Sequence, residues 1–284
     1  MKRNRGFRRM ARRHVLVPLG RQLAQSAAVF GAAVGGGAAV AAAAQPNFVQ
    51  FGRTTNFIVS YDDALGADGQ TISQAIIDTC EADFQTLQGY FGGITPAGLP
   101  FNVQVTTDDT GAGHFGCAGT ELFIGARSAA TLDTVLMRQL VIAEEDEVFE
   151  ANFGQGWDCG ASNGEGLSRV LGNDMVPGSE RPNFVSAPVW LDNDRPDYLN
   201  TTDPTDRNYL SIGCSVLFLN WMRFQLGFGW DKIIAAGDTT LAGTYANLTG
   251  ANDGPDKFMQ LMEANFPSDQ PSGLATDNPF PLPD

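Results

Sequence analysis

Histidine is nearly absent from this chain, which has two, His14 and His114, in 284 residues. His14 lies in a basic N-terminal segment that we expect to be removed on export, which leaves His114 alone. A catalytic zinc ion is held by three protein ligands, in one common set two histidines and a glutamate. A single remaining histidine excludes a zinc site of that kind within one protomer.

Basic residues are also scarce beyond residue 44. Eight of the 18 Lys and Arg residues lie in residues 1–44, so the rest of the chain has ten against all 32 Asp and Glu residues, a net charge near −22. Such a surface repels phosphate backbones and anionic lipids. We therefore expect no nucleic-acid partner, and no membrane association once the N-terminal segment has been removed.

Cysteine is sparse and forms no CxxC pair. The four cysteines are Cys80, Cys117, Cys159 and Cys214. Their scattered spacing favours structural disulfides in an oxidising compartment over a metal knot. Four cysteines allow three pairings. Of these we favour Cys80–Cys117 and Cys159–Cys214, because each bond would join neighbouring parts of the chain.

Residues 1–44 predict an export signal. They contain no Asp or Glu, and their basic part is followed by a run of mostly Ala, Gly and Val, Ser26 to Ala44. The small residues before Gln45 are of the kind that a signal peptidase accepts. The run is long enough for a membrane anchor, but its lack of Leu and Ile favours a cleaved signal. We expect a secreted or periplasmic protein, and Arg12-Arg13 suggests the twin-arginine route.

Apolar periodicity predicts an α+β fold in which a small N-terminal sheet with a helix precedes a mainly helical half. The expected strands are residues 47–61, 100–106 and 120–126, with turns at 65–69 and 109–113. The expected helices are residues 71–90, 130–152, 163–171, 209–228, 230–236, 240–248 and 257–264. We divide the chain into a signal (1–44), one domain (45–265) and a Pro-rich tail (266–284).

The helix expected at 130–152 contains four consecutive acidic residues, Glu144 to Glu147. In the zinc-peptidase motif H-E-x-x-H, two histidines one helical turn apart bind the metal and the glutamate activates its water. Here Glu144 has the place of that glutamate, while Ala143 and Glu147 stand where the histidines would be. The alternative interpretation is that the four acids form a solvated helix face.

Two further segments extend this pattern. Asn163-Gly164-Glu165-Gly166 opens the next expected helix, eighteen residues after Glu147, and Tyr209-Leu210-Ser211-Ile212-Gly213 opens another. With the degenerate motif, they make residues 50–265 resemble the gluzincin class of zinc peptidases. The block Gly156 to Leu171 also resembles a segment shared by a group of exported bacterial proteins.

The resemblance implies a zincin-like fold and roles for individual residues. Glu165 corresponds to the third metal ligand of gluzincins, and Tyr209 to the tyrosine that stabilises their tetrahedral transition state. Glu144 corresponds to the general base. His114, on the Gly-rich turn before Cys117, is a further candidate, because the strand that lines the substrate in zincins would bring it to the cleft. The alternative is that it is merely an exposed turn residue.

Without the two histidines, Glu144, Glu147 and Glu165 leave two outcomes open. A hard cation, Ca²⁺ or Mn²⁺ but not zinc, could join them through oxygen ligands. Alternatively, mutual repulsion raises one pKa and the carboxyl groups share a proton, as in a general acid/base pair. We expect either a peptidase-related hydrolase acting on an extracellular peptide or polysaccharide, or a non-catalytic binding or structural protein on the same scaffold.

Overall fold

A computed structural model describes residues 46–126, 132–205 and 207–283. The chain divides into two units, Met1–Ala44 and Gln45–Asp284, and only the second contains described residues. The expected export signal therefore lies outside the described residues, as does the start of the helix predicted at residue 130. No helix in the described ranges is both long and apolar enough to cross a membrane.

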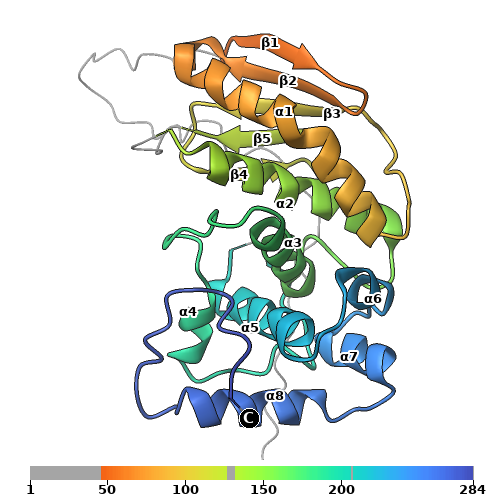
Figure 1. Cartoon of the computed structure of the whole chain (residues 1–284), viewed down its shortest axis with the longest axis vertical. Helices are drawn as coiled ribbons and strands as arrows, with labels where there is room; N and C mark the ends of the chain where they lie inside the picture. The colour runs from red at the N-terminus through yellow and green to blue at the C-terminus, as the bar shows by residue number, and fades with distance from the viewer. Residues whose placement is uncertain (1–45, 127–131, 206, 284) are drawn as a thin grey trace, which may run out of the picture. The chain divides into compact units, whose positions relative to one another are not determined.

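Five strands of the described residues form one mixed sheet in the order β1-β2-β3-β5-β4 (Figure 1). They are β1 (Phe48–Arg53), β2 (Phe57–Asp62), β3 (Phe101–Thr106), β4 (Gly111–His114) and β5 (Glu121–Gly125). The three inner strands are parallel, and each edge strand runs antiparallel to its neighbour. The single strand predicted for residues 47–61 is wrong. It is a hairpin, whose turn is closed where the Thr54 N–H donates to the carbonyl of Phe57 over 2.9 Å.

Two helices, α1 (Gly66–Tyr90) and α2 (Thr134–Phe153), cover one face of this sheet. The ring of Phe84 on α1 contacts Phe57 of β2, Phe101 of β3 and Phe149 of α2. Helix α1 begins at Gly66, within the turn predicted at 65–69. That turn is wrong because a short 3₁₀ segment, Asp63–Leu65, capped by the side chain of Asp62, leads directly into the helix.

Helix α2 is surrounded by other elements. It packs against α1 and the β4–β5 edge of the sheet on one side, and against α3 (Ser162–Met175) on the other. The four acidic residues from Glu144 to Glu147 are each 9 % exposed or less. The interpretation of this run as a solvated face is therefore wrong.

The second half of the chain is helical, which confirms the predicted α+β class. After α3 come α4 (Ala187–Leu191), α5 (Tyr209–Asn220), the π-helical turn η2 (Trp221–Gln225), α6 (Trp230–Ala235), α7 (Leu241–Thr249) and α8 (Gly254–Asn265). The short α4 is not predicted by the sequence pattern. Helix α5 is apolar on all sides because α3, α4 and α8 enclose it.

The Pro-rich tail packs on this half of the domain. The buried carboxylate of Asp277 accepts hydrogen bonds from the backbone N–H groups of Ser186 and Ala187, at the start of α4, over 2.8 and 2.6 Å. Phe280 is 8 % exposed and belongs to the hydrophobic core. The tail therefore satisfies backbone donors that the short helix cannot satisfy itself.

Candidate functional site

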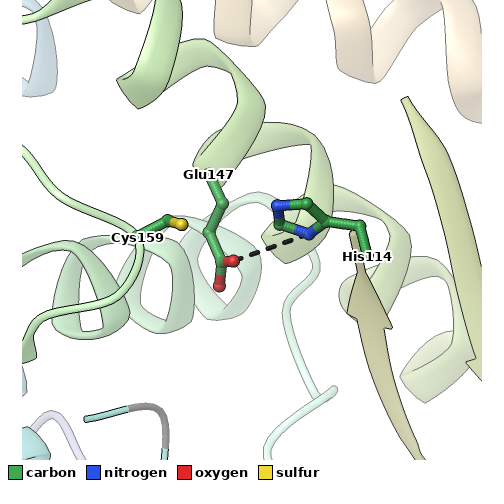
Figure 2. Close-up of side chains that lie close together, drawn as sticks. All are labelled: His114, Glu147 and Cys159. Atoms are coloured by element: carbon green, nitrogen blue, oxygen red, sulfur yellow. Dashed lines mark ion pairs between the residues drawn. The ribbon is translucent and has the colours of Figure 1, made fainter. Parts of the chain in front are cut away.

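His114 is the last residue of the edge strand β4, and not part of a turn as predicted. Pairing of β4 with β5 directs its imidazole towards α2, where Nδ1 lies 2.7 Å from Oε2 of Glu144 and 3.7 Å from Oε2 of Glu147 (Figure 2). The side chain of His114 is only 4 % exposed. The one histidine beyond residue 44 therefore lies between two carboxylates of the degenerate motif.

Glu144 and Glu147 differ in their surroundings although they are three residues apart on α2. Glu144 is fixed by its contact with His114. The pKa of Glu147 is raised well above its ordinary value, first by burial and then by the negative charges of Glu144 and Glu165. Burial and like charges both favour the protonated form of a carboxyl group. Glu147 therefore keeps its proton to a higher pH than an ordinary glutamate.

Glu165 lies in the first turn of α3 and is 8 % exposed. Gly166 allows α3 to approach α5 closely, since a Cβ at this position would lie 2.6 Å from the Cβ of Ser215. Oε2 of Glu165 lies 3.8 Å from Nε of Arg169, one turn further along the helix. Arg169 is not among the site residues predicted from the sequence, although its four-residue spacing from Glu165 indicates a shared helix face.

Tyr209 begins α5 at the same site. Its ring lies below the guanidinium of Arg169, with Cζ 5.0 Å from the ring centroid, an arrangement typical of a cation–π contact. Its hydroxyl donates to the carbonyl of Asn183 over 3.3 Å. The tyrosine therefore reaches the site, but its hydroxyl must leave Asn183 to donate a hydrogen bond to a bound molecule.

These groups line one cleft of about 560 Å³. Lining side chains include His114, Glu144, Glu147, Glu165, Arg169 and Tyr209. The structure thus brings together every candidate catalytic, metal-binding or cleft residue that the sequence indicated. A concave site with a few convergent polar groups and a perturbed carboxyl group is the usual form of a binding or active site.

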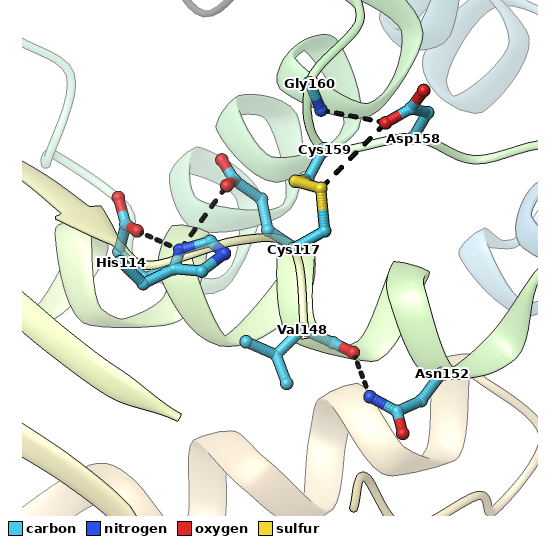
Figure 3. Close-up of a disulfide and its surroundings, with 9 residues drawn as sticks. His114, Cys117, Val148, Asn152, Asp158, Cys159 and Gly160 are labelled. Atoms are coloured by element: carbon cyan, nitrogen blue, oxygen red, sulfur yellow. Dashed lines mark hydrogen bonds and ion pairs between the residues drawn. A yellow bond between two sulfur atoms is a disulfide. The ribbon is translucent and has the colours of Figure 1, made fainter. Parts of the chain in front are cut away.

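A disulfide joins Cys117, which follows β4, to Cys159, which precedes α3, with a Cα–Cα distance of 5.7 Å (Figure 3). The predicted pairs Cys80–Cys117 and Cys159–Cys214 are therefore wrong. Cys80 and Cys214 are buried free thiols in α1 and α5, and burial raises the pKa of each, that of Cys80 to about 12. The predicted pairs join cysteines that are neighbours in the sequence. In the fold, β4 packs against α2, and this brings Cys117 close to Cys159 in the loop between α2 and α3.

Three further acidic residues of α2 are fully buried away from the cleft lining, namely Glu145, Asp146 and Glu150. Burial raises the pKa of all three, and that of Asp146 reaches about 8. Asp146 and Glu150 lie one turn apart, and their carboxyl groups are close enough to influence each other's pKa. No other described group donates a hydrogen bond to either carboxyl group. A proton on one of the two can therefore form a hydrogen bond to the other.

Comparisons with protein-family models, with curated proteins and with solved structures find no match to this chain. The resemblance to gluzincins therefore stays a prediction from the sequence motifs. What the cleft can do has to be argued from its own groups. They supply a hydrogen-bonded imidazole–carboxyl pair, a second carboxyl group whose pKa is raised, and a guanidinium.

Proposed function

We propose that this chain is an exported hydrolase of an extracellular polymer, a peptide or a polysaccharide, which works with carboxyl and imidazole groups instead of a zinc ion. The observation that carries the proposal is the position of His114, with Nδ1 2.7 Å from Glu144 and 3.7 Å from Glu147 at the wall of an open cleft. Positioned acids and bases of this kind accelerate proton transfer by roughly 10²–10⁴-fold.

Each group has a distinct role in this reaction. Glu144, hydrogen-bonded to His114, accepts a proton from the attacking water. Glu147 keeps its proton because its pKa is raised, and it donates that proton to the leaving group. Arg169 supplies positive charge beside Tyr209, where negative charge on the reacting oxygen can be stabilised.

The gluzincin-like scaffold is part of the same proposal. It is supported by the order of the elements around the cleft: an antiparallel edge strand, the motif helix α2, the helix α3 that carries Glu165, and the helix α5 that carries Tyr209. A Ca²⁺ or Mn²⁺ ion held by the three glutamates is the less favoured alternative. Both ions prefer oxygen ligands, whereas the imidazole nitrogen of His114 already engages Glu144.

Hydrolysis of peptide and glycan libraries by the purified protein tests the proposal. We expect activity that survives a chelator and falls by about 10²–10⁴-fold in Glu144→Gln and in Glu147→Gln. Glu121→Gln is the matched control, because Glu121 is exposed at the start of β5 and lies outside the cleft lining. Equal activity in all three variants, or loss of activity in the chelator, would contradict the proposal.

A binding protein on the same scaffold would give a different result. It would retain the polymer in the cleft, as measured by calorimetry, without cleaving it in the wild type. Binding that weakens in Arg169→Gln and is unaccompanied by turnover would therefore replace the hydrolase with the non-catalytic alternative.

A further inference from the structure

The disulfide Cys117–Cys159 lies in the wall of the cleft, next to the carboxylate cluster. A ligating atom from each of His114, Glu147 and Cys159 lies within 4.8 Å of the other two. Figure 2 shows the imidazole and the sulfur on either side of the Glu147 carboxyl group. Three donors from β4, α2 and the loop before α3 thus converge on one point.

Thiolate, imidazole and carboxylate together form a donor set that suits zinc. Zinc binds sulfur at about 2.3 Å, and nitrogen and oxygen at about 2.0–2.2 Å, in a tetrahedral arrangement. Donor atoms around a tetrahedral zinc ion are therefore roughly 3.5 Å apart. Nδ1 of His114 and Oε2 of Glu147 already lie 3.7 Å apart. The site requires rotation of the Cys159 side chain and release of Nδ1 of His114 from its 2.7 Å contact with Glu144.

In the oxidised chain the sulfur of Cys159 is bonded to Cys117 and cannot act as a thiolate ligand. We propose that reduction of this disulfide creates a zinc site formed by Cys159, His114 and Glu147. The site differs from the degenerate motif position, because two of its three ligands come from outside α2. It also differs from the two-histidine set that the residue count excludes.

The chemistry of the switch needs a two-electron reductant, for example a dithiol or, in vitro, a phosphine with water. A dithiol transfers two electrons and two protons to the Cys117–Cys159 bond, which yields two thiols, and leaves as its own disulfide; a phosphine gives the same two thiols with water and leaves as its oxide. Zn²⁺ then replaces the proton of the Cys159 thiol and binds the two neighbouring groups. Both cysteines line the cleft and are within reach of a reductant, whereas the thiols of Cys80 and Cys214 are buried elsewhere.

This inference does not depend on the proposed hydrolysis, since its readout is bound metal. If both hold, zinc occupies His114 and Glu147 and thereby removes the proton donor from the reaction. Reduction in the presence of zinc would then inhibit the enzyme. Failure of the hydrolase proposal leaves the zinc measurement unaffected, and the reverse is also true.

Zinc content after incubation with Zn²⁺ and gel filtration tests the proposal. Oxidised wild type should retain little metal, whereas wild type reduced by a phosphine should retain about one zinc ion per chain. Cys117→Ser keeps the Cys159 thiol free without any reductant and should bind zinc in the same way. Cys159→Ser is the matched control, because it also breaks the disulfide but leaves Cys117 as the thiol, and it should bind at least about tenfold less.

Cobalt substitution identifies the ligand. A thiolate-to-cobalt charge-transfer band should appear in Cys117→Ser and in reduced wild type, and be absent from Cys159→Ser. His114→Gln and Glu147→Gln in the Cys117→Ser background should each weaken binding by at least about tenfold. Equal zinc in Cys117→Ser and Cys159→Ser, or no gain of zinc in reduced wild type over oxidised wild type, would overturn the proposal.

Discussion

In the proposed reaction Glu144 is the proton acceptor and Glu147, three residues further along α2, is the proton donor. Both carboxyl groups face His114, but Glu144 takes the short contact to Nδ1, while burial and the negative charges of Glu144 and Glu165 raise the pKa of Glu147. A carboxyl group with a raised pKa is suited to act as a general acid. The surroundings of the two carboxyl groups differ because Nδ1 of His114 lies 2.7 Å from Glu144 but 3.7 Å from Glu147.

The pH dependence of hydrolysis follows from the raised pKa of Glu147. A general acid must carry its proton, so the rate should fall as the pH rises through that pKa. In Glu147→Gln the rate should be about 10²–10⁴-fold lower and this alkaline limb should vanish, because an amide does not titrate. Profiles of kcat/KM against pH check this prediction, and an unchanged limb in the variant would assign it to another group.

At the scale of single residues, the sequence predicts which side chains line the cleft, but not which groups they contact there. The motif spacing pointed to Glu144, Glu147 and Glu165, and all three line the cleft. The place of His114 depends on pairing between β4 and β5, which Gly-rich residues 111–113 do not indicate by alternation. The partner of Cys117 depends on that same pairing, and so the predicted disulfides were wrong.

At the scale of elements, α2 is the unusual feature. Its periodicity predicted a helix, but a helix with four consecutive acids is normally expected to be amphipathic. Here α1, the sheet and α3 cover it on several sides, so acidic residues on all its faces are buried. Burial of this kind is a property of the packed elements, and no pattern within the helix predicts it.

The pair Asp146–Glu150 makes α2 a pH-sensitive element. The unfolded chain loses the Asp146 proton near the ordinary Asp value of 3.8, whereas the folded chain holds it to about 8. The folded-state pKa of Asp146 is thus raised. The contribution of this group to the free energy of unfolding is fully present below pH 3.8 and is lost as the pH rises towards 8. Asp146→Asn keeps a donor for Glu150 without a titrating proton, and it should increase the free energy of unfolding at pH 8 by on the order of 1–3 kcal/mol.

Chemical denaturation at pH 5 and pH 8 measures this difference. The gain from Asp146→Asn should be smaller at pH 5, where the wild-type carboxyl group keeps its proton. Asp269→Asn serves as the control, since Asp269 is exposed and the same substitution there should have no pH-dependent effect. A variant that is destabilised equally at both pH values would show that the carboxyl group is ionised and held by other contacts.

At the scale of the whole described domain, the α+β class and most element positions followed from periodicity. The sequence did not indicate how the sheet-bearing half meets the helical half. At that junction α2 packs against α3, and the Cys117–Cys159 bond joins the two halves in the wall of the cleft. These are contacts between segments far apart in sequence, and local patterns carry little information about them.

The disulfide across this junction gives the last prediction. Under denaturing conditions the oxidised chain should titrate two thiols, Cys80 and Cys214, and four after reduction. The bond closes a segment with a sequence separation of 42, so the chain-entropy model assigns it about 4 kcal/mol of stability. The double variant Cys117→Ser/Cys159→Ser should lose about that amount in chemical denaturation. A reductant should destabilise the wild type similarly, but leave the double variant unchanged, because the two remaining thiols form no bond that it could break.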